Sequence, residues 1–116
     1  MKIILPWPDK RLSPNSRTHW KAKMGPKQKA RIDASWATIA AEGFHDYEAP
    51  ADGPIPVRVT FYPPDARRRD DDNAIGALKA ARDGIADALD VDDSRFKSEY
   101  HFGAPEKPGR VEVEIG

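Results

Sequence analysis

Residues 55–62 read Ile-Pro-Val-Arg-Val-Thr-Phe-Tyr, and this stretch decides the fold class. Its apolar side chains recur at every second position, with Arg58 and Thr60 between them. That period of two predicts a half-buried β-strand over 55–62. Pro63 and Pro64 end the strand, because proline has no backbone N–H group to donate to a neighbouring strand.

The chain downstream of this strand predicts one helix and two more strands. Asp71 or Asp72 is a suitable N-cap for the helix, whose apolar stripe consists of Ile75, Leu78, Ile85 and Leu89. Arg82 falls inside this stripe, where it is expected to snorkel to solvent, pair with an acid or lie at a subunit contact. Strands over 96–102 and 110–115 flank a turn rich in proline and glycine, so a closing hairpin is expected.

Upstream of residues 55–62, the pattern predicts a short strand over 2–7, a loop, and a helix over 26–43. Lys27 and Arg31 are expected to face outward from this helix. The residues that it is expected to bury are Ile32, Trp36 and Ile39. The order β-α-β-α-β-β predicts an α+β fold with a small mixed sheet of about four strands packed with two helices. The length of 116 residues fits a single domain over 1–116.

The composition excludes several classes of chemistry. The chain has no cysteine, which rules out disulfides, thiolate nucleophiles and zinc–thiolate sites. Its three histidines are isolated in sequence, which disfavours a zinc site. The apolar run at residues 3–5 is far shorter than the core of a signal peptide or a spanning helix. A cytoplasmic protein without a membrane partner is therefore expected.

The net charge of zero hides a strong segregation of charge along the chain. Residues 83–106 contain seven acids against two bases, whereas residues 10–31 contain eight bases and no acid. The basic segment also contains His19 and Trp20, a mixture that suits phosphate contacts and stacking on bases. A solvated basic loop is the alternative. The side chains expected to contact nucleic acid are Asn15, Arg17, Lys21, Lys23, Lys27 and Arg31, with Arg68 and Arg69 from a second basic run.

That second run leads into an acidic cluster, Asp70-Asp71-Asp72-Asn73. In an extended backbone Asp70 and Asp72 project to the same side, and two close carboxylates with hard oxygen ligands suit Mg²⁺ or Mn²⁺. The alternative is a helix N-cap on a solvated loop. An EF-hand is disfavoured, because Ala74 stands where that motif needs an oxygen ligand.

Two positions further along could complete such a site. Asp92 and Asp93 offer a third carboxylate, although an Asp-Asp pair at a turn is commonly solvated. Lys79 lies seven residues beyond Asp72, about 20° around a helix axis from it, so both fall on one face. An ammonium group there could stabilise negative charge on a phosphate, and an exposed surface lysine is the alternative.

These residues together resemble the RusA family of Holliday-junction resolvases, small dimeric endonucleases found in bacteria and prophages. The resemblance spans nearly the whole chain, and it is carried by Leu5-Pro6-Trp7-Pro8, Ser13-Pro14-Asn15-Ser16-Arg17, Arg67 to Asn73, Leu78-Lys79 and Asp92-Asp93-Ser94. It implies a metal site formed by Asp70, Asp72 and Asp93, with Asp93 aligning better than Asp92, and a catalytic role for Lys79. One departure is that the family lysine stands four residues after the second aspartate, where this chain has Gly76.

The resemblance also implies the activity. A magnesium-dependent endodeoxyribonuclease, with Mn²⁺ able to substitute, would resolve four-way junctions by phosphodiester hydrolysis in DNA recombination and repair. It would act as a homodimer on branched DNA. Two alternatives stay open: a non-catalytic nucleic-acid-binding protein of the same fold, and a nucleotide-sugar transferase, in which D-x-D also binds a divalent metal. The chain is short for a transferase of that kind.

Overall fold

The computed structural model describes residues 1–116, and it confirms an α+β fold with a four-stranded mixed sheet. The strands are β1 (Lys2–Pro6), β2 (Ile55–Tyr62), β3 (Phe96–Phe102) and β4 (Arg110–Ile115). The helices are α1 (Trp20–Ile39), α2 (Asp71–Ala77) and α3 (Lys79–Leu89), with short 3₁₀ helices η1 (Lys10–Leu12) and η2 (Asp93–Arg95) in two connections. The bounds of β2, β3 and β4 coincide with the predicted ranges.

The predicted hairpin between the last two strands is wrong. The strand order is β1-β4-β2-β3, so β4 lies between β1 and β2 and is antiparallel to both, while β3 pairs in parallel with β2. Burial explains the arrangement: β4 buries four of its six residues and takes a central place, whereas β3 buries only Phe96 and lies at the edge. A turn-rich connection of seven residues is long enough to carry the chain past β2.

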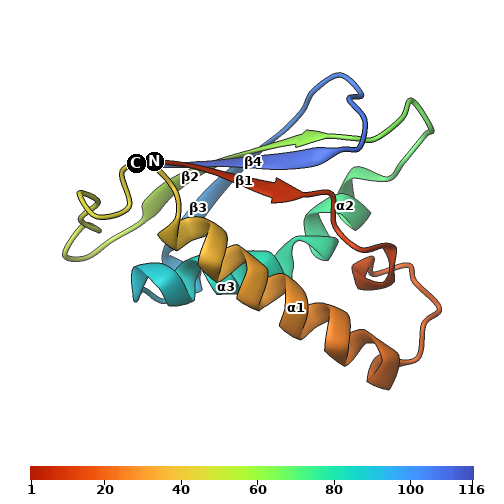
Figure 1. Ribbon diagram of the computed structural model, residues 1–116, viewed down its shortest axis with the longest axis horizontal. Coiled ribbons are helices and arrows are strands. Elements are labelled where there is room, and N and C mark those ends of the chain that lie inside the picture. The colour runs from red at the N-terminus through yellow and green to blue at the C-terminus, as the bar shows by residue number, and fades with distance from the viewer.

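All three helices cover the same face of the sheet, as Figure 1 shows. Both β1 and β2 are antiparallel to β4, and β2 is parallel to β3, so β1, β2 and β3 run in one direction. The chain moves across the sheet in the order β1, β2, β3. Right-handed crossovers therefore place α1 and the α2–α3 pair on one side. The same topology puts the carboxyl ends of β1 and β2 at the same end of the sheet.

Helix α1 differs from its prediction in both its start and its orientation. It begins at Trp20, because His19 caps it by accepting a hydrogen bond at Nδ1 from the Lys21 N–H at 3.2 Å. Ala34 and Thr38 are the residues that it buries. The predicted core residues Ile32, Trp36 and Ile39 are instead 56%, 66% and 38% exposed. The helix thus presents an apolar face, defined by these three residues, away from the sheet.

Close packing of α1 on α3 explains why small residues face the core. A Cβ atom added to Gly84 of α3 would lie 2.0 Å from the backbone carbonyl oxygen of Arg31 in α1. Next to this contact, the Arg31 guanidinium donates to both carboxylate oxygens of Asp87, at 2.6 and 2.8 Å. The two helices are therefore held at a distance that admits no larger side chain at residue 84.

Replacement of Gly84 by alanine is expected to destabilise the protein by about 2 kcal/mol, because backbone must move to relieve the overlap. The matched control is Gly25→Ala in α1, where an added Cβ has nothing within 4 Å. That change is expected to be neutral or to stabilise by up to about 1 kcal/mol, since alanine favours helix. Urea denaturation measures both values, and equal stabilities of the two variants would contradict this packing.

The second predicted helix is divided at Leu78 into α2 and α3. Leu78 and Ile85 are buried as predicted. Arg82, the charged residue in the apolar stripe, points its guanidinium at the segment before β3. It donates to the backbone carbonyl oxygens of Asp93 at 3.3 Å and of Phe96 at 3.1 Å. This arginine therefore anchors the η2 turn against α3.

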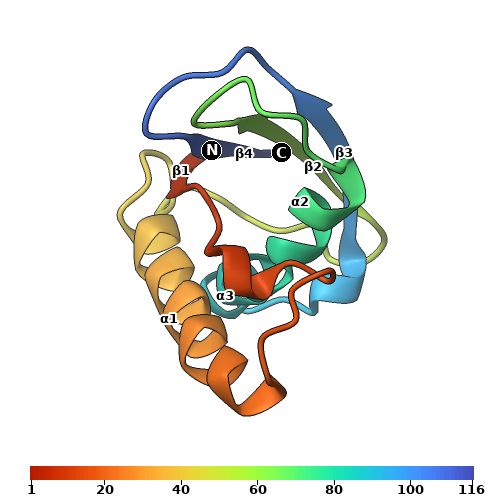
Figure 2. The same ribbon diagram turned by 90° about the vertical axis from the view of Figure 1, so that its right-hand side faces the viewer.

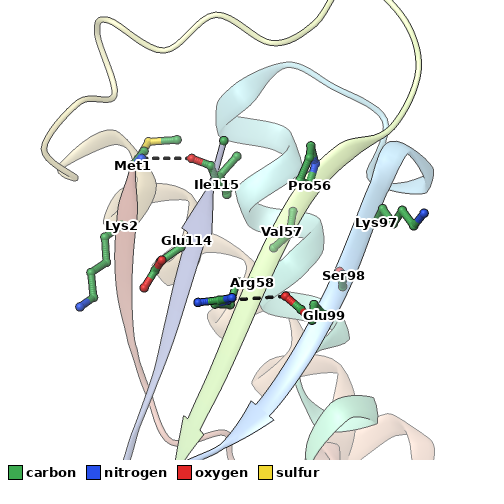
Figure 3. Close-up of a pocket in the computed structure, with 11 residues that line it drawn as sticks. Met1, Lys2, Pro56, Val57, Arg58, Lys97, Ser98, Glu99, Glu114 and Ile115 are labelled. Carbon is green, nitrogen blue, oxygen red and sulfur yellow. Dashed lines mark hydrogen bonds and ion pairs between the residues drawn. The ribbon is translucent and has the colours of Figure 1, made fainter.

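The face of the sheet away from the helices is polar, and acidic and basic side chains lie next to one another on it. Lys2, Glu114, Arg58 and Glu99 form one row across the four strands, with alternating charge (Figure 3). The Arg58 Nε atom lies 3.5 Å from Glu99 Oε2. A depression of about 880 Å³ lies beside this row, lined by comparable numbers of basic and acidic side chains. None of the helices combines the length and the apolar character needed to cross a bilayer.

Candidate nucleic-acid interface and acidic site

The segments that follow β1 and β2 meet at the end of the sheet where these two strands finish. Trp7 follows β1 directly, and the basic run with Asp70 follows β2. They enclose a cavity of about 310 Å³ whose lining includes Trp7, Arg68, Asp70 and Asn73. The loop after β1, with η1, packs against both α1 and α2 (Figure 2). The sequence motifs at the two ends of this loop are therefore brought to the acidic cluster.

Asp70 is the N-cap of α2, one residue before the predicted caps. Its Oδ1 atom accepts a hydrogen bond from the Asp72 N–H at 2.9 Å, while Asp71 and Asp72 lie in the first helical turn. The capping interpretation of the cluster is thus correct for Asp70, and the predicted cap role of Asp71 or Asp72 is wrong. One Oδ atom of Asp70 caps the helix, so the other can still contact a ligand.

Lys79 lies between two carboxylates at the start of α3. Its Nζ atom is 3.0 Å from Asp83 Oδ1 and 3.2 Å from Asp93 Oδ2. The hydrogen bonds to Asp83 and then Asp93 raise the pKa of Lys79, and the bond from Lys79 lowers the pKa of Asp93. The structure therefore brings together two predicted site residues that are 14 positions apart. The anchor from Arg82 to the η2 turn explains their approach.

Asp83 was not among the predicted site residues, yet it is a direct partner of Lys79. A Lys–Asp pair four residues apart on a helix face was the signal available in the sequence. That signal is weak, because such pairs are common on exposed helices. The contact with Asp93 distinguishes this pair from an ordinary one.

The structure does not group Asp70, Asp72 and Asp93 around one position. No three acidic or histidine side chains form a cluster that could hold a metal ion. Topology gives the reason: Asp70 follows the carboxyl end of β2, whereas Asp93 precedes the amino end of the parallel strand β3. Helix α2, about 10 Å long, separates them. The residues as they stand do not fit a three-carboxylate magnesium site, and that ligand set stays a prediction.

Gly76 occupies the position at which the family pattern has a lysine, and the structure shows why a side chain is excluded there. A Cβ atom at Gly76 would lie 2.4 Å from the Cγ atom of Pro14. The loop that contains Pro14 thus packs directly on α2. Lys79, one turn further along the chain, provides the ammonium group that approaches Asp93 instead.

A second cavity, of about 580 Å³, lies between α1 and the α2–α3 pair and is strongly basic. Lys23, Lys27, Arg31 and Lys79 line it, with Asp83 as its one acid. Arg31 is paired with Asp87, and the Lys23 Nζ atom donates to the Ser16 carbonyl oxygen at 3.4 Å. Lys27 has no ion-pair partner. This basic cavity is suited to a phosphate group.

The other predicted nucleic-acid contacts divide into free and engaged side chains. Asn15, Arg17, Lys21 and Arg68 are exposed, and the Lys21 Nζ atom lies 5.6 Å from the ring centre of Trp20. Arg69 is engaged: it donates to Asp65 Oδ1 at 2.8 Å and lies 5.6 Å from the Trp7 ring centre. Arg31 and Arg69 are therefore engaged in ion pairs within the protein, with Asp87 and Asp65 respectively.

Comparison with known proteins adds a relative but no activity. No model of a known protein family matches this sequence. A protein of Xylella fastidiosa (strain Temecula1 / ATCC 700964) is 42% identical to it over 98 residues, which is 83% of this chain and 62% of that protein. The chain thus spans less than two thirds of that relative, which is described as an uncharacterized protein.

Proposed function

We propose that this chain is a magnesium-dependent endodeoxyribonuclease of the RusA type that cuts four-way DNA junctions in the cytoplasm. The observation that supports this most is the approach of Lys79 to Asp93 beside a basic cavity. The resemblance pairs a helix lysine with a closing acidic pair, and this contact joins those two motifs. The loop that resembles the family's N-terminal segment also lies against α2, the helix that begins at the acidic cluster.

The basic side chains would supply most of the affinity for DNA. Lys23 and Lys27 face the cavity that also contains Lys79, and each phosphate they neutralise releases counterions. Binding should therefore weaken steeply as salt rises. Lys79 would place positive charge near the phosphate under attack. The magnesium requirement, with Asp70, Asp72 and Asp93 as ligands, is supported by the resemblance and by the chemistry of carboxylates.

A non-catalytic nucleic-acid-binding protein is the second candidate, and one observation favours it. The three carboxylates are not grouped, and Asp93 already has an ammonium partner in Lys79. A protein that only binds DNA would need the basic cavity but no metal site. It would bind junctions with the same dependence on salt and leave them uncut.

A cleavage assay separates these two functions. A synthetic four-way junction and a linear duplex of equal length, each labelled on one strand, are incubated with the protein in Mg²⁺ or in EDTA. We expect cuts near the branch point of the junction, in Mg²⁺ only, and none in the duplex. Saturating binding to the junction without cuts in Mg²⁺ or Mn²⁺ would instead assign the binding function.

We also propose that the chain acts as a homodimer, in which the apolar face of α1 is covered by a second copy. Ile32, Trp36 and Ile39 are exposed on one side of this helix, where water contact is unfavourable. A twofold dimer would present two sites to two strands of like polarity.

Trp36→Glu is expected to convert a dimer to a monomer in sedimentation equilibrium, and Glu42→Lys, just beyond the helix, to leave it dimeric. A monomeric wild-type protein would contradict this.

A further inference from the structure

Trp7 lines two adjoining cavities at the end of the sheet where β1 and β2 finish. The cavity of about 310 Å³ contains Asp70 and Asn73, and a second one, of about 480 Å³, extends between β1 and α1. Both are lined by Trp7, Pro8, Asp9 and Ala77. Because they share these lining residues, the two cavities adjoin and we call them two chambers of one hollow, and the volume of each falls within the range of small-ligand sites, about 300–1,000 Å³.

The two chambers differ in character. The larger one is lined by apolar side chains, among them Leu5, Leu12 and Leu78. The charged residues at its edge neutralise one another, because Arg11 pairs with Asp9 and Lys29 pairs with Asp33. An apolar group entering this chamber would therefore displace water without separating any ion pair.

The smaller chamber has free positive charge. Lys10 and Arg68 line it, and neither has an ion-pair partner. Two acids line the same chamber, Asp9, which is paired with Arg11, and Asp70, so an anion held there would lie beside the acidic cluster. A ligand that fits both chambers must combine an anionic part with a flat or compact apolar part.

The indole of Trp7 is held in place from two sides. Its ring packs edge-on against Phe61 with ring centres 6.0 Å apart, and the guanidinium of Arg69 lies 5.6 Å from its centre. Three bonds fix Arg69 in turn, to Asp65 Oδ1 and to the carbonyl oxygens of Asp65 and Arg67. A rigid aromatic wall of this kind suits stacking on a base of any sequence.

We propose that this two-chambered hollow binds one unpaired nucleotide of the DNA, with its phosphate beside Lys10 and Arg68 and its base in the apolar chamber past Trp7. This rests on the proposed function, because it takes branched DNA as the ligand. Branched DNA offers bases whose unpairing costs little, since the duplex is already interrupted at the branch point. The nucleotide held here would fix which phosphodiester lies next to Asp70.

An abasic scan tests this subsite by binding alone. Wild-type protein is titrated, without divalent metal, against four-way junctions that each carry one abasic residue at successive positions from the branch point. We expect one position per strand at which the missing base weakens binding by about 5-fold or more. Positions on either side should match the intact junction. No effect at any position, with tight binding to the intact junction, would overturn the subsite.

Two variants locate the effect in the hollow. Ala30→Leu fills the apolar chamber from α1 without changing Trp7, and Trp7→Leu removes the stacking wall. Both are expected to weaken binding to the intact junction about 5-fold and to leave binding to the sensitive abasic junction unchanged. Ala22→Leu, an exposed residue of α1 outside both chambers, is the control. Equal weakening on both junctions by Ala30→Leu would contradict a base in this chamber.

The proposed function can fail separately. A protein that shows the abasic effect but leaves junctions uncut in Mg²⁺ would keep the subsite and lose the nuclease activity. A protein that cuts junctions but shows no sensitive position would keep the activity and lose the subsite.

Discussion

An Asp70→Asn variant is expected to fold like the wild type and to cut four-way junctions more than about 100-fold more slowly. Folding should survive because asparagine caps a helix as well as aspartate does, so the bond to the Asp72 N–H is kept. Only the negative charge is lost. Single-turnover cleavage in Mg²⁺ measures the rate, and thermal unfolding checks the fold.

Asp71→Asn is the matched control, because Asp71 is exposed in the first turn of the same helix and is not a proposed ligand. It removes the same charge from the same helix end, and we expect the wild-type rate. If both variants lost activity equally, the general electrostatics of the helix start would be responsible. If Asp70→Asn cut normally, the acidic cluster would not be the site.

Replacement of Lys79 by methionine is expected to lower the cleavage rate at saturating DNA by about 100-fold and to weaken junction binding far less. The reason is its position: the Nζ atom lies 3.2 Å from Asp93 and faces the basic cavity, so its charge is near the proposed reacting phosphate. Stability should change by less than about 1 kcal/mol, because the Lys79 side chain is 62% exposed.

Lys97→Met provides the comparison for this variant, since Lys97 is an exposed lysine of β3 beside the depression on the far side of the sheet. It should leave both rate and binding at the wild-type level. Saturating and limiting DNA concentrations separate the two effects. A Lys79→Met variant that lost affinity but kept its maximal rate would make Lys79 one phosphate contact among several.

The strands were predictable because their signal is local. The alternation in 55–62 depends only on which face of one strand is buried, and the structure reproduces those bounds. Pairing is not local in this way. β3 and β4 follow each other in sequence but lie on opposite sides of β2, and no short-range pattern records that β4 takes the central place.

Helix α1 shows how an apolar pattern can mislead. Ile32, Trp36 and Ile39 have helical spacing, which predicts that they face the core, but α1 packs on α3 through Gly84, where only small residues fit. The inner face is therefore lined by Ala34 and Thr38. The spacing correctly identified a helix and one apolar face, but it could not show which side met the core.

The site was predictable as a set of residue types and less so as an arrangement. The contact between Lys79 and Asp93 depends on the turn after α3 and on the anchor from Arg82, neither of which has a sequence signature. The same holds for Pro14, whose contact with α2 excludes a side chain at Gly76. Tertiary contacts between distant segments decide these positions.

The shared metal site is tested most directly by crystals grown with Mn²⁺ and a non-cleaved junction. Manganese is located by its anomalous scattering, which separates it from water and sodium. In the free chain these carboxylates are not grouped, so the proposal requires DNA and metal to draw them together. We expect one peak per chain within about 2–3 Å of carboxylate oxygens of Asp70, Asp72 and Asp93, with Lys79 moved to a DNA phosphate. A well-ordered complex in which manganese is absent from these residues, or in which Asp93 keeps Lys79 as its partner, would contradict the shared site.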